Sequence, residues 1–173
     1  MKTLFKRICL SSLMILAIAV SVSAQKKKKA DNDTKEWRYE IEAVATGGEG
    51  SYLIKVWSYS KKPEIAIEQA KKNAVHGVIF KGFAAIQGVP GQKPLAQDPN
   101  VEMEKAEFFD SFFSDGGKYM KFVSVSNDGA VAAEDRMKIG KEYKVGVVVT
   151  VMKDNLRKDL EAAGIIKGLG SMF

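Results

Sequence analysis

Residues 36–59 read EWRYEIEAVATGGEGSYLIKVWSY, and their pattern predicts two antiparallel strands joined by a tight turn. From Glu36 to Thr46, apolar and polar residues alternate, which is typical of a strand with one buried face and one solvated face. The glycine-rich segment 47–50 can adopt positive φ and therefore predicts the turn. Residues 52–59 are rich in aromatic and β-branched side chains, which favour the second strand.

A helix is predicted over residues 63–81, directly after this hairpin. Pro63 suits the first helical position, because the N–H that proline lacks would be unpaired there. Gly82 suits the C-terminal cap. Apolar and small residues recur at helical spacing along the segment and should let the helix lie close to the sheet. They are Ile67, Ala70, Ala74 and Val78.

Residues 83–97 show no periodicity and predict a long loop, which is either a recognition surface or a mobile connection. A second helix is predicted from Asp98-Pro99 to about Ser114, since aspartate is a good N-cap and proline a good first residue. Its four phenylalanines should face the core rather than a ligand, because each buries a large apolar area. They are Phe108, Phe109, Phe112 and Phe113.

The C-terminal third completes the predicted domain. Residues 119–126 predict a third strand, whereas residues 130–140 are ambiguous. The valine-rich segment 142–152 predicts a central, largely buried strand. Asp154 should cap a short last helix that Gly164 ends. We therefore expect an α+β fold, with a mostly antiparallel sheet of about four strands and two to three helices packed on one face.

The N-terminus predicts export from the cytoplasm. A basic start and an apolar run lead to Val22-Ser23-Ala24, the small-x-small pattern that signal peptidase prefers, so residues 1–24 should be a signal peptide. Residues 25–35 should form a disordered basic leader. Residues 36–165 should be the single α+β domain, and residues 166–173 a flexible tail.

Composition excludes several classes of function. Removal of the three cations of the signal peptide lowers the formal net charge from +6 to +3, which favours solubility and does not indicate nucleic-acid binding. Cys9 is the only cysteine and lies at the start of the apolar run, so we expect no disulfide, no thiol nucleophile and no lipid anchor. The mature chain lacks the stretch of ~20 apolar residues that a membrane helix needs.

No residue is predicted to be catalytic, cofactor-binding or metal-binding, and we expect that the protein is not an enzyme. His76 is the only histidine, and its helical phase predicts a solvent-facing position. A zinc site is not expected without a second histidine or a thiol. Hydrolase chemistry would need two carboxylates in a cleft. The candidates Glu102, Glu104 and Glu107 instead predict the solvated side of an amphipathic helix.

Two segments resemble a known family of envelope proteins. Tyr52–Ser58 followed by Ile65–Ala74 resembles the small envelope domain of Lpp-type outer-membrane lipoproteins and the N-terminal domain of the flagellar assembly protein FlgT. Lys141–Thr150 resembles the closing strand of that family, and the whole is similar to small secreted Bacteroidetes proteins. The chain lacks the lipobox of the lipoprotein members. The resemblance covers about residues 37–160 and implies an α+β domain that works by protein contacts, without catalytic residues.

We therefore expect a non-catalytic interaction or assembly module of the bacterial cell envelope, periplasmic or secreted after cleavage near Ala24. Its partner should be another envelope protein, with weak contact to anionic lipid through Lys26, Lys27, Lys28 and Lys29. The alternative is a soluble protein that binds a small apolar or glycan ligand through the 83–97 loop. A binder should show a pocket at the loop, and an assembly module an apolar patch or an open sheet edge.

Overall fold

The computed structural model describes residues 37–48, 50–126 and 130–168. The predicted signal peptide, the basic leader and the end of the predicted tail lie outside the described residues. These three assignments therefore stay predictions.

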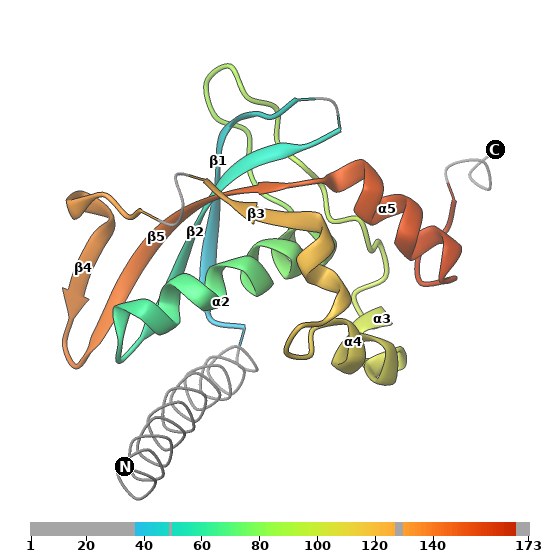
Figure 1. Cartoon of the computed structure of the whole chain (residues 1–173). Helices are drawn as coiled ribbons and strands as arrows, with labels where there is room; N and C mark the ends of the chain where they lie inside the picture. Colours follow the sequence, from blue (N-terminus) through green and yellow to red (C-terminus); the bar gives the residue numbers. More distant parts are fainter. Residues whose placement is uncertain (1–36, 49, 127–129, 169–173) are drawn as a thin grey trace, which may run out of the picture.

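Five antiparallel strands form one sheet, which confirms the predicted α+β class (Figure 1). The predicted hairpin is formed by β1 (Tyr39–Thr46) and β2 (Tyr52–Ser60), and β2 pairs in turn with β5 (Glu142–Val151). The short strands β3 (Val123–Val125) and β4 (Arg136–Ile139) both pair with β5, at its C-terminal and N-terminal parts respectively. β4 lies in the segment that the sequence left ambiguous, after a 3₁₀ turn over Ala133–Asp135, and it is the strand beyond the expected four.

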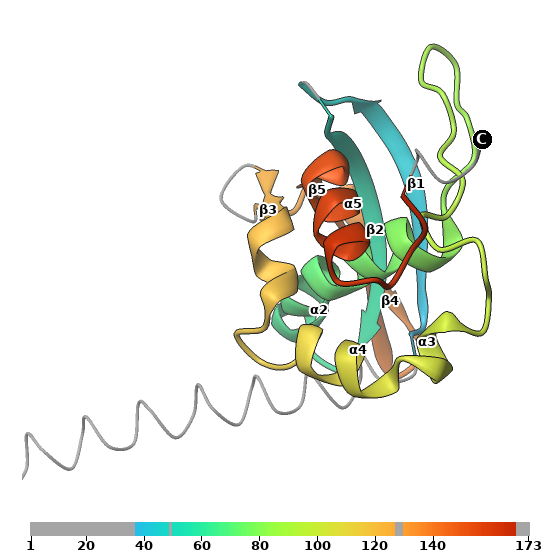
Figure 2. The same cartoon turned by 90° about the vertical axis from the view of Figure 1, so that its right-hand side faces the viewer.

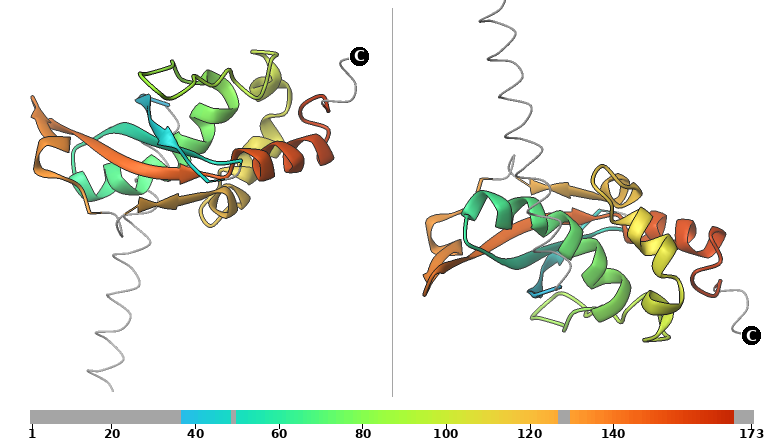
Figure 3. Two further views of the ribbon diagram at one scale, coloured as in Figure 1. Left: turned by 90° about the horizontal axis from the view of Figure 1, so that it is seen from above. Right: turned by 90° about the horizontal axis from the view of Figure 1, so that it is seen from below.

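One face of the sheet packs against α2 (Pro63–His76), which continues as a π-helical turn over Gly77–Lys81 (Figure 3). The predicted 63–81 helix is thereby confirmed. The alanines of the predicted stripe, Ala70 and Ala74, are fully buried against β2 and β5, because their small side chains permit close approach. One hydrogen bond joins helix and sheet: Asn73 Nδ2 donates to Ser58 Oγ at 2.8 Å, while the buried Oδ1 of the same amide has no partner among the described residues.

The opposite face of the sheet carries aromatic and charged side chains that contact one another. Trp57 Nε1 donates to Glu42 Oε1 at 2.9 Å, and Lys144 Nζ donates to Glu40 Oε2 at 2.6 Å. The Trp57 indole lies across Gly146, where an added Cβ would be 2.9 Å from the ring. This face is therefore an ordered polar surface around one tryptophan.

The predicted second helix is broken in the structure. α3 (Val101–Glu104) and α4 (Ala106–Phe112) are separated at Lys105, whose φ of −113° and ψ of 31° are not helical. The phenylalanines face the core as predicted, with Phe109, Phe112 and Phe113 buried and Phe108 partly buried.

The predicted third strand is also shorter than expected. Residues 118–122 form a 3₁₀ helix, and only β3 pairs in the sheet. The prediction of a strand from residue 119 was therefore wrong for its first half. The two rings of this segment, Tyr119 and Phe122, are buried, so its side chains anchor it without strand pairing.

α5 (Lys153–Ala162) follows β5 directly and ends before Gly164, whose φ is +66°, as predicted. The predicted cap at Asp154 was wrong, because the helix begins one residue earlier, with Met152 as its N-cap and Asp154 in its first turn. The β4–β5 hairpin and α5 lie at opposite ends of the sheet (Figure 3). The 83–97 loop contains a narrow ladder, bridged at Phe83–Gln92 and Ile86–Val89, that projects from the same end of the molecule as the β1–β2 turn (Figures 1 and 2). Within the described part of the chain, no helix has the length and apolar character needed to cross a bilayer.

Candidate functional site

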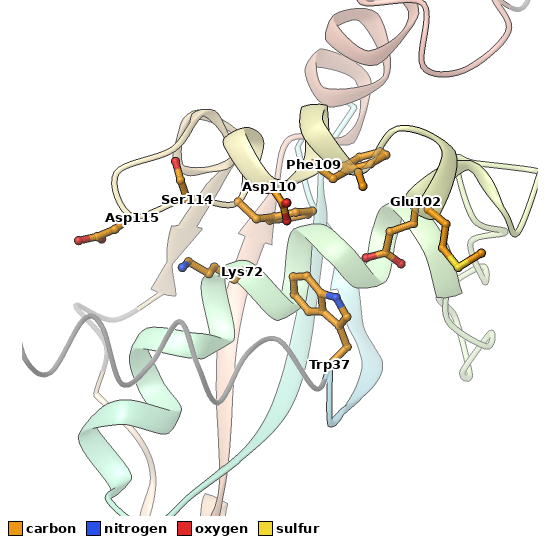
Figure 4. A pocket seen from close by; sticks show the side chains of 10 residues that line it. Trp37, Lys72, Glu102, Phe109, Asp110, Ser114 and Asp115 are labelled. Atoms are coloured by element: carbon orange, nitrogen blue, oxygen red, sulfur yellow. The ribbon is translucent and has the colours of Figure 1, made fainter.

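A pocket of about 630 Å³ lies between α2 and the α3–α4 pair (Figure 4). This volume is in the range of sites for small organic molecules. We call it the Trp37 pocket. Its apolar walls are Trp37, Met103, Ala106, Phe109 and Phe113.

His76 lies behind the wall of this pocket and is only 3% exposed. The prediction that it faces solvent was therefore wrong. Tyr39 of β1 contacts one edge of the imidazole, and Trp37 and Glu102 of α3 contact the rest, so this side of α2 is covered as well. The phase argument assumed that only one side of the helix would be buried.

A chain of two hydrogen bonds passes through His76. Tyr39 Oη lies 2.6 Å from Nδ1, and Nε2 lies 3.0 Å from Glu102 Oε1. Burial, helped by the charge of Glu102, raises the pKa of Tyr39 well above its ordinary value of 10. The tyrosine hydroxyl therefore stays protonated and donates a hydrogen bond to Nδ1. The ring proton is then on Nε2, which donates a hydrogen bond to Glu102.

His76 is held in its neutral form. Burial lowers its pKa below the ordinary value of 6.5 and outweighs the opposite effect of Glu102. The positive charge of Lys81 lowers the pKa of His76 further; the Nζ atom of this lysine lies 3.8 Å from the centre of the neighbouring Tyr39 ring. Because the imidazole is neutral, it orients the carboxylate of Glu102 without cancelling its charge.

Trp37 is fixed against the same histidine. The indole and imidazole stack with centroids 3.6 Å apart and planes inclined by 18°, and Phe113 meets the indole edge-on at 5.1 Å. Trp37 is the one non-glycine residue with positive φ in the described chain, at +44°. This conformation is unfavourable for a bulky residue and persists only where the surrounding contacts hold it, as the stacking on His76 does here.

The charged side chains of the Trp37 pocket are mostly acidic. Carboxylates of Glu102, Asp110 and Asp115 line it together with the single cation Lys72 (Figure 4). Burial lowers the pKa of Lys72, and the nearby charge of Asp115 opposes that effect. The pocket thus combines aromatic walls with an excess of negative charge.

The acidic residues that the sequence considered do not all meet in this pocket. Glu102 lines it, whereas Glu104 and Glu107 line a separate surface hollow of about 720 Å³ beside Phe108. The three carboxylates therefore do not form one hydrolase-like group. Among the described residues, no three His, Asp or Glu side chains are placed to hold a metal ion.

The 83–97 loop contributes only its last residues to the pockets described here. Leu95, Ala96 and Gln97 line a third pocket, of about 490 Å³, against the C-terminal end of α5. Backbone hydrogen bonds from Leu95 and Ala96 to Val78 and Ile79 tie this part of the loop to the π-helical turn. Ligand binding by the loop stays a prediction.

Sequence reasoning did not find the Trp37 pocket, although it considered most of its residues separately. The alternation in 36–46 implies that Trp37 lies on the apolar face of a strand, and the pattern of the predicted second helix placed the phenylalanines in the core and Glu102 on a solvated helix face. The missing information was their convergence on His76, which joins segments far apart in the sequence. The one available signal was that the chain has a single histidine, His76.

Comparisons with known protein families, with curated proteins and with solved structures found no match. The resemblance to Lpp-type lipoproteins and to the FlgT N-terminal domain therefore stays a prediction.

Proposed function

We propose that this protein is a non-catalytic binding module of the bacterial cell envelope, and that the Trp37 pocket is its ligand site. The observation that carries the proposal is the pocket itself, in which Trp37 and Glu102 are both held in place by the buried His76. A site whose side chains are already positioned loses little conformational entropy when a ligand enters. The signal peptide predicted from the sequence supports the location.

The chemistry around His76 supports binding rather than catalysis. Both ring nitrogens are occupied, by Tyr39 and by Glu102, and burial lowers the pKa of the imidazole. A general base needs access to its substrate and a pKa near the working pH. Both nitrogens of the buried His76 are already engaged, so it has no access to a substrate, and we assign it a positioning role.

Titration with Nile red, a neutral apolar dye that fluoresces in dry surroundings, tests whether the pocket takes up organic molecules. We expect saturable fluorescence with the wild-type protein and its loss in Ala106→Trp, which fills the pocket from α4. Ala162→Trp, at an exposed position of α5, is the matched control and should behave like the wild type. Equal dye binding by both variants would contradict the proposal.

A second candidate function is the assembly module expected from the sequence, and the edge of the sheet favours it. Among the described strands, β1 pairs only with β2, so its other side can accept an extended segment of a partner protein. The sheet also has exposed large apolar side chains. They are Val44 on β1 and Met137 and Ile139 on β4.

A photo-crosslinking amino acid at Val44, introduced in growing cells, tests this second function. One reproducible partner that mass spectrometry identifies as an envelope protein is the expected result. The same probe at Lys158, an exposed position of α5, is the control and should not capture that protein. Equal capture from both positions would argue against assembly through β1.

A further inference from the structure

We propose that the ligand of the Trp37 pocket is a small organic cation with an alkylated ammonium group. Glu102 and Asp110 would balance its charge, and Trp37 and Phe109 would contact its alkyl groups. This inference rests on the proposed function and adds the chemical class of the ligand.

The first step of the argument is the charge that the pocket presents. Lys72 and Asp115 lie near enough to influence one another electrostatically, so their opposite charges largely offset. Glu102 and Asp110 then give the pocket a net negative charge (Figure 4). The neutral His76 does not cancel the charge of Glu102; Lys81 lies near enough to feel that charge but does not line the pocket, so a bound anion would be repelled by the two carboxylates.

The second step is the chemistry of the walls. An ammonium group is attracted to the face of an aromatic ring, most strongly to tryptophan, and the attraction grows when water is excluded. Fully alkylated (quaternary) ammonium groups carry no N–H and need no hydrogen-bond acceptors, which suits a pocket walled by Trp37, Phe109 and Phe113. A neutral apolar compound such as Nile red can still fit the same walls, but it binds more weakly than a cation of similar shape, because it removes water from Glu102 and Asp110 without balancing their charge.

The third step is the fixed position of Glu102. Its side chain is 33% exposed and therefore reaches the pocket, while His76 Nε2 holds one of its oxygens at 3.0 Å. Tyr39 fixes the orientation of that imidazole. The Glu102 carboxylate is therefore held in position before a ligand binds, as is usual for the few polar groups that give a small-molecule site its specificity.

Choline and its neutral isostere 3,3-dimethylbutan-1-ol test the inference, because they share shape and differ in charge. Binding is followed by the indole N–H signals of the two tryptophans in ¹⁵N NMR spectra, which Trp57→Phe assigns. We expect choline to shift the Trp37 signal saturably and to bind about tenfold more tightly than the alcohol, the difference that a desolvated cation–aromatic contact supplies.

Variants of the two carboxylates test their role. Glu102→Gln keeps an acceptor for His76, and Asp110→Asn changes an exposed residue, so at least one of them should remain folded. Each should weaken choline binding about three- to tenfold. Glu107→Gln, on the same helix as Asp110 but lining the other hollow, is the control and should leave the affinity unchanged.

The outcomes separate this inference from the proposed function. If the alcohol binds as tightly as choline, or if the carboxylate variants do not weaken choline binding, the organic-cation assignment is wrong while the pocket remains a ligand site. If neither compound shifts Trp37 and Nile red does not bind, both proposals are wrong. Co-flotation of the wild type, but not of Asp110→Asn, with phosphatidylcholine vesicles would indicate a lipid headgroup as the source of the cation; its absence would indicate a free small molecule.

Discussion

The indole of Trp37 stacks on the imidazole of His76, with ring centroids 3.6 Å apart and planes inclined by 18°. This contact joins a residue two positions before β1 to the last residue of α2. Tyr39 and Glu102 occupy the two nitrogens at the edge of the same imidazole. His76 is thus a central structural residue of the pocket wall, and substitutions around it should change stability in specific ways.

Tyr39→Phe should lower the free energy of unfolding by about 1–3 kcal/mol, because it leaves Nδ1 of His76 buried without a partner. Urea denaturation measures the effect. Tyr59→Phe is the matched control: its hydroxyl bonds to Glu40 on an exposed part of the sheet, and its loss should cost less than about 1 kcal/mol. Equal effects of the two substitutions would show that the Tyr39–His76 bond adds nothing special.

Stability should decrease as the pH falls below about 6.5. Burial lowers the pKa of His76 in the folded protein, so between the lowered value and 6.5 the unfolded chain binds more protons than the folded one, and protonation favours unfolding. The slope should not exceed about 1.4 kcal/mol per pH unit. The charged and titratable groups around this histidine are Tyr39 on β1, Glu102 on α3 and Lys81 on the π-helical turn.

Urea denaturation between pH 7.5 and 5.5 measures this dependence, and His76→Gln is the comparison. The chain has one histidine, so the variant should lose the slope in this range even if it is less stable throughout. A wild-type protein with the same stability at both pH values would contradict the lowered pKa. The exposed carboxyl of Glu40, whose pKa Lys144 lowers, should add its own loss only below about pH 4.5.

Gly82→Ala should destabilise the protein more than Gly88→Ala. Both glycines have positive φ, at +67° and +79°, so both substitutions carry backbone strain of about 1–2 kcal/mol. At Gly82 the added Cβ would also lie 2.1 Å from the carbonyl oxygen of Gln92, whereas at Gly88 nothing lies within 4 Å. The difference between their urea midpoints measures the cost of disturbing the close approach between Gly82 and the Gln92 carbonyl, which holds the 83–92 ladder against the end of the π-helical turn. Equal midpoints would show that this approach relaxes without cost.

Ala70→Leu tests the packing of α2 on the sheet. Ala70 is fully buried, so the larger side chain should overpack the interface and cost about 1–3 kcal/mol. Ala162→Leu introduces the same change at an exposed position of α5 and should be nearly neutral. Unchanged thermal stability of Ala70→Leu would contradict the close packing.

The sequence was sufficient to predict the elements whose signals are local. Alternation in 36–59 predicted β1 and β2, Pro63 marked the first residue of α2, and Gly164 marked the end of α5. Each of these signals acts within a few residues of the element that it controls.

Elements that depend on distant contacts were predicted less well. The break at Lys105 lets α4 turn its phenylalanines toward the π-helical turn, where Phe109 meets Phe80 edge-on at 5.0 Å. Residues 118–122 are anchored by buried Tyr119 and Phe122 rather than by strand pairing. No pattern within either segment indicates the surface on which it packs.

The candidate site was the least predictable part. Glu102 was recognised as a possible functional carboxylate, but it was assigned to the solvated face of a helix. Its association with His76, 26 positions earlier in the chain, required α2 to be covered on two sides. Helical periodicity shows which faces of a helix are apolar. It does not show that a separate segment of the chain packs on another face.

The use of α2 on both sides has a thermodynamic consequence. The same helix packs against the sheet and forms one side of the Trp37 pocket, so the pocket cannot exist in the unfolded chain. Folding and ligand binding are therefore linked equilibria. A ligand present at 100 times its Kd would raise the free energy of unfolding by about 2.7 kcal/mol. A melting curve is therefore a label-free screen for the natural ligand, because a compound that fills this pocket must raise the Tm.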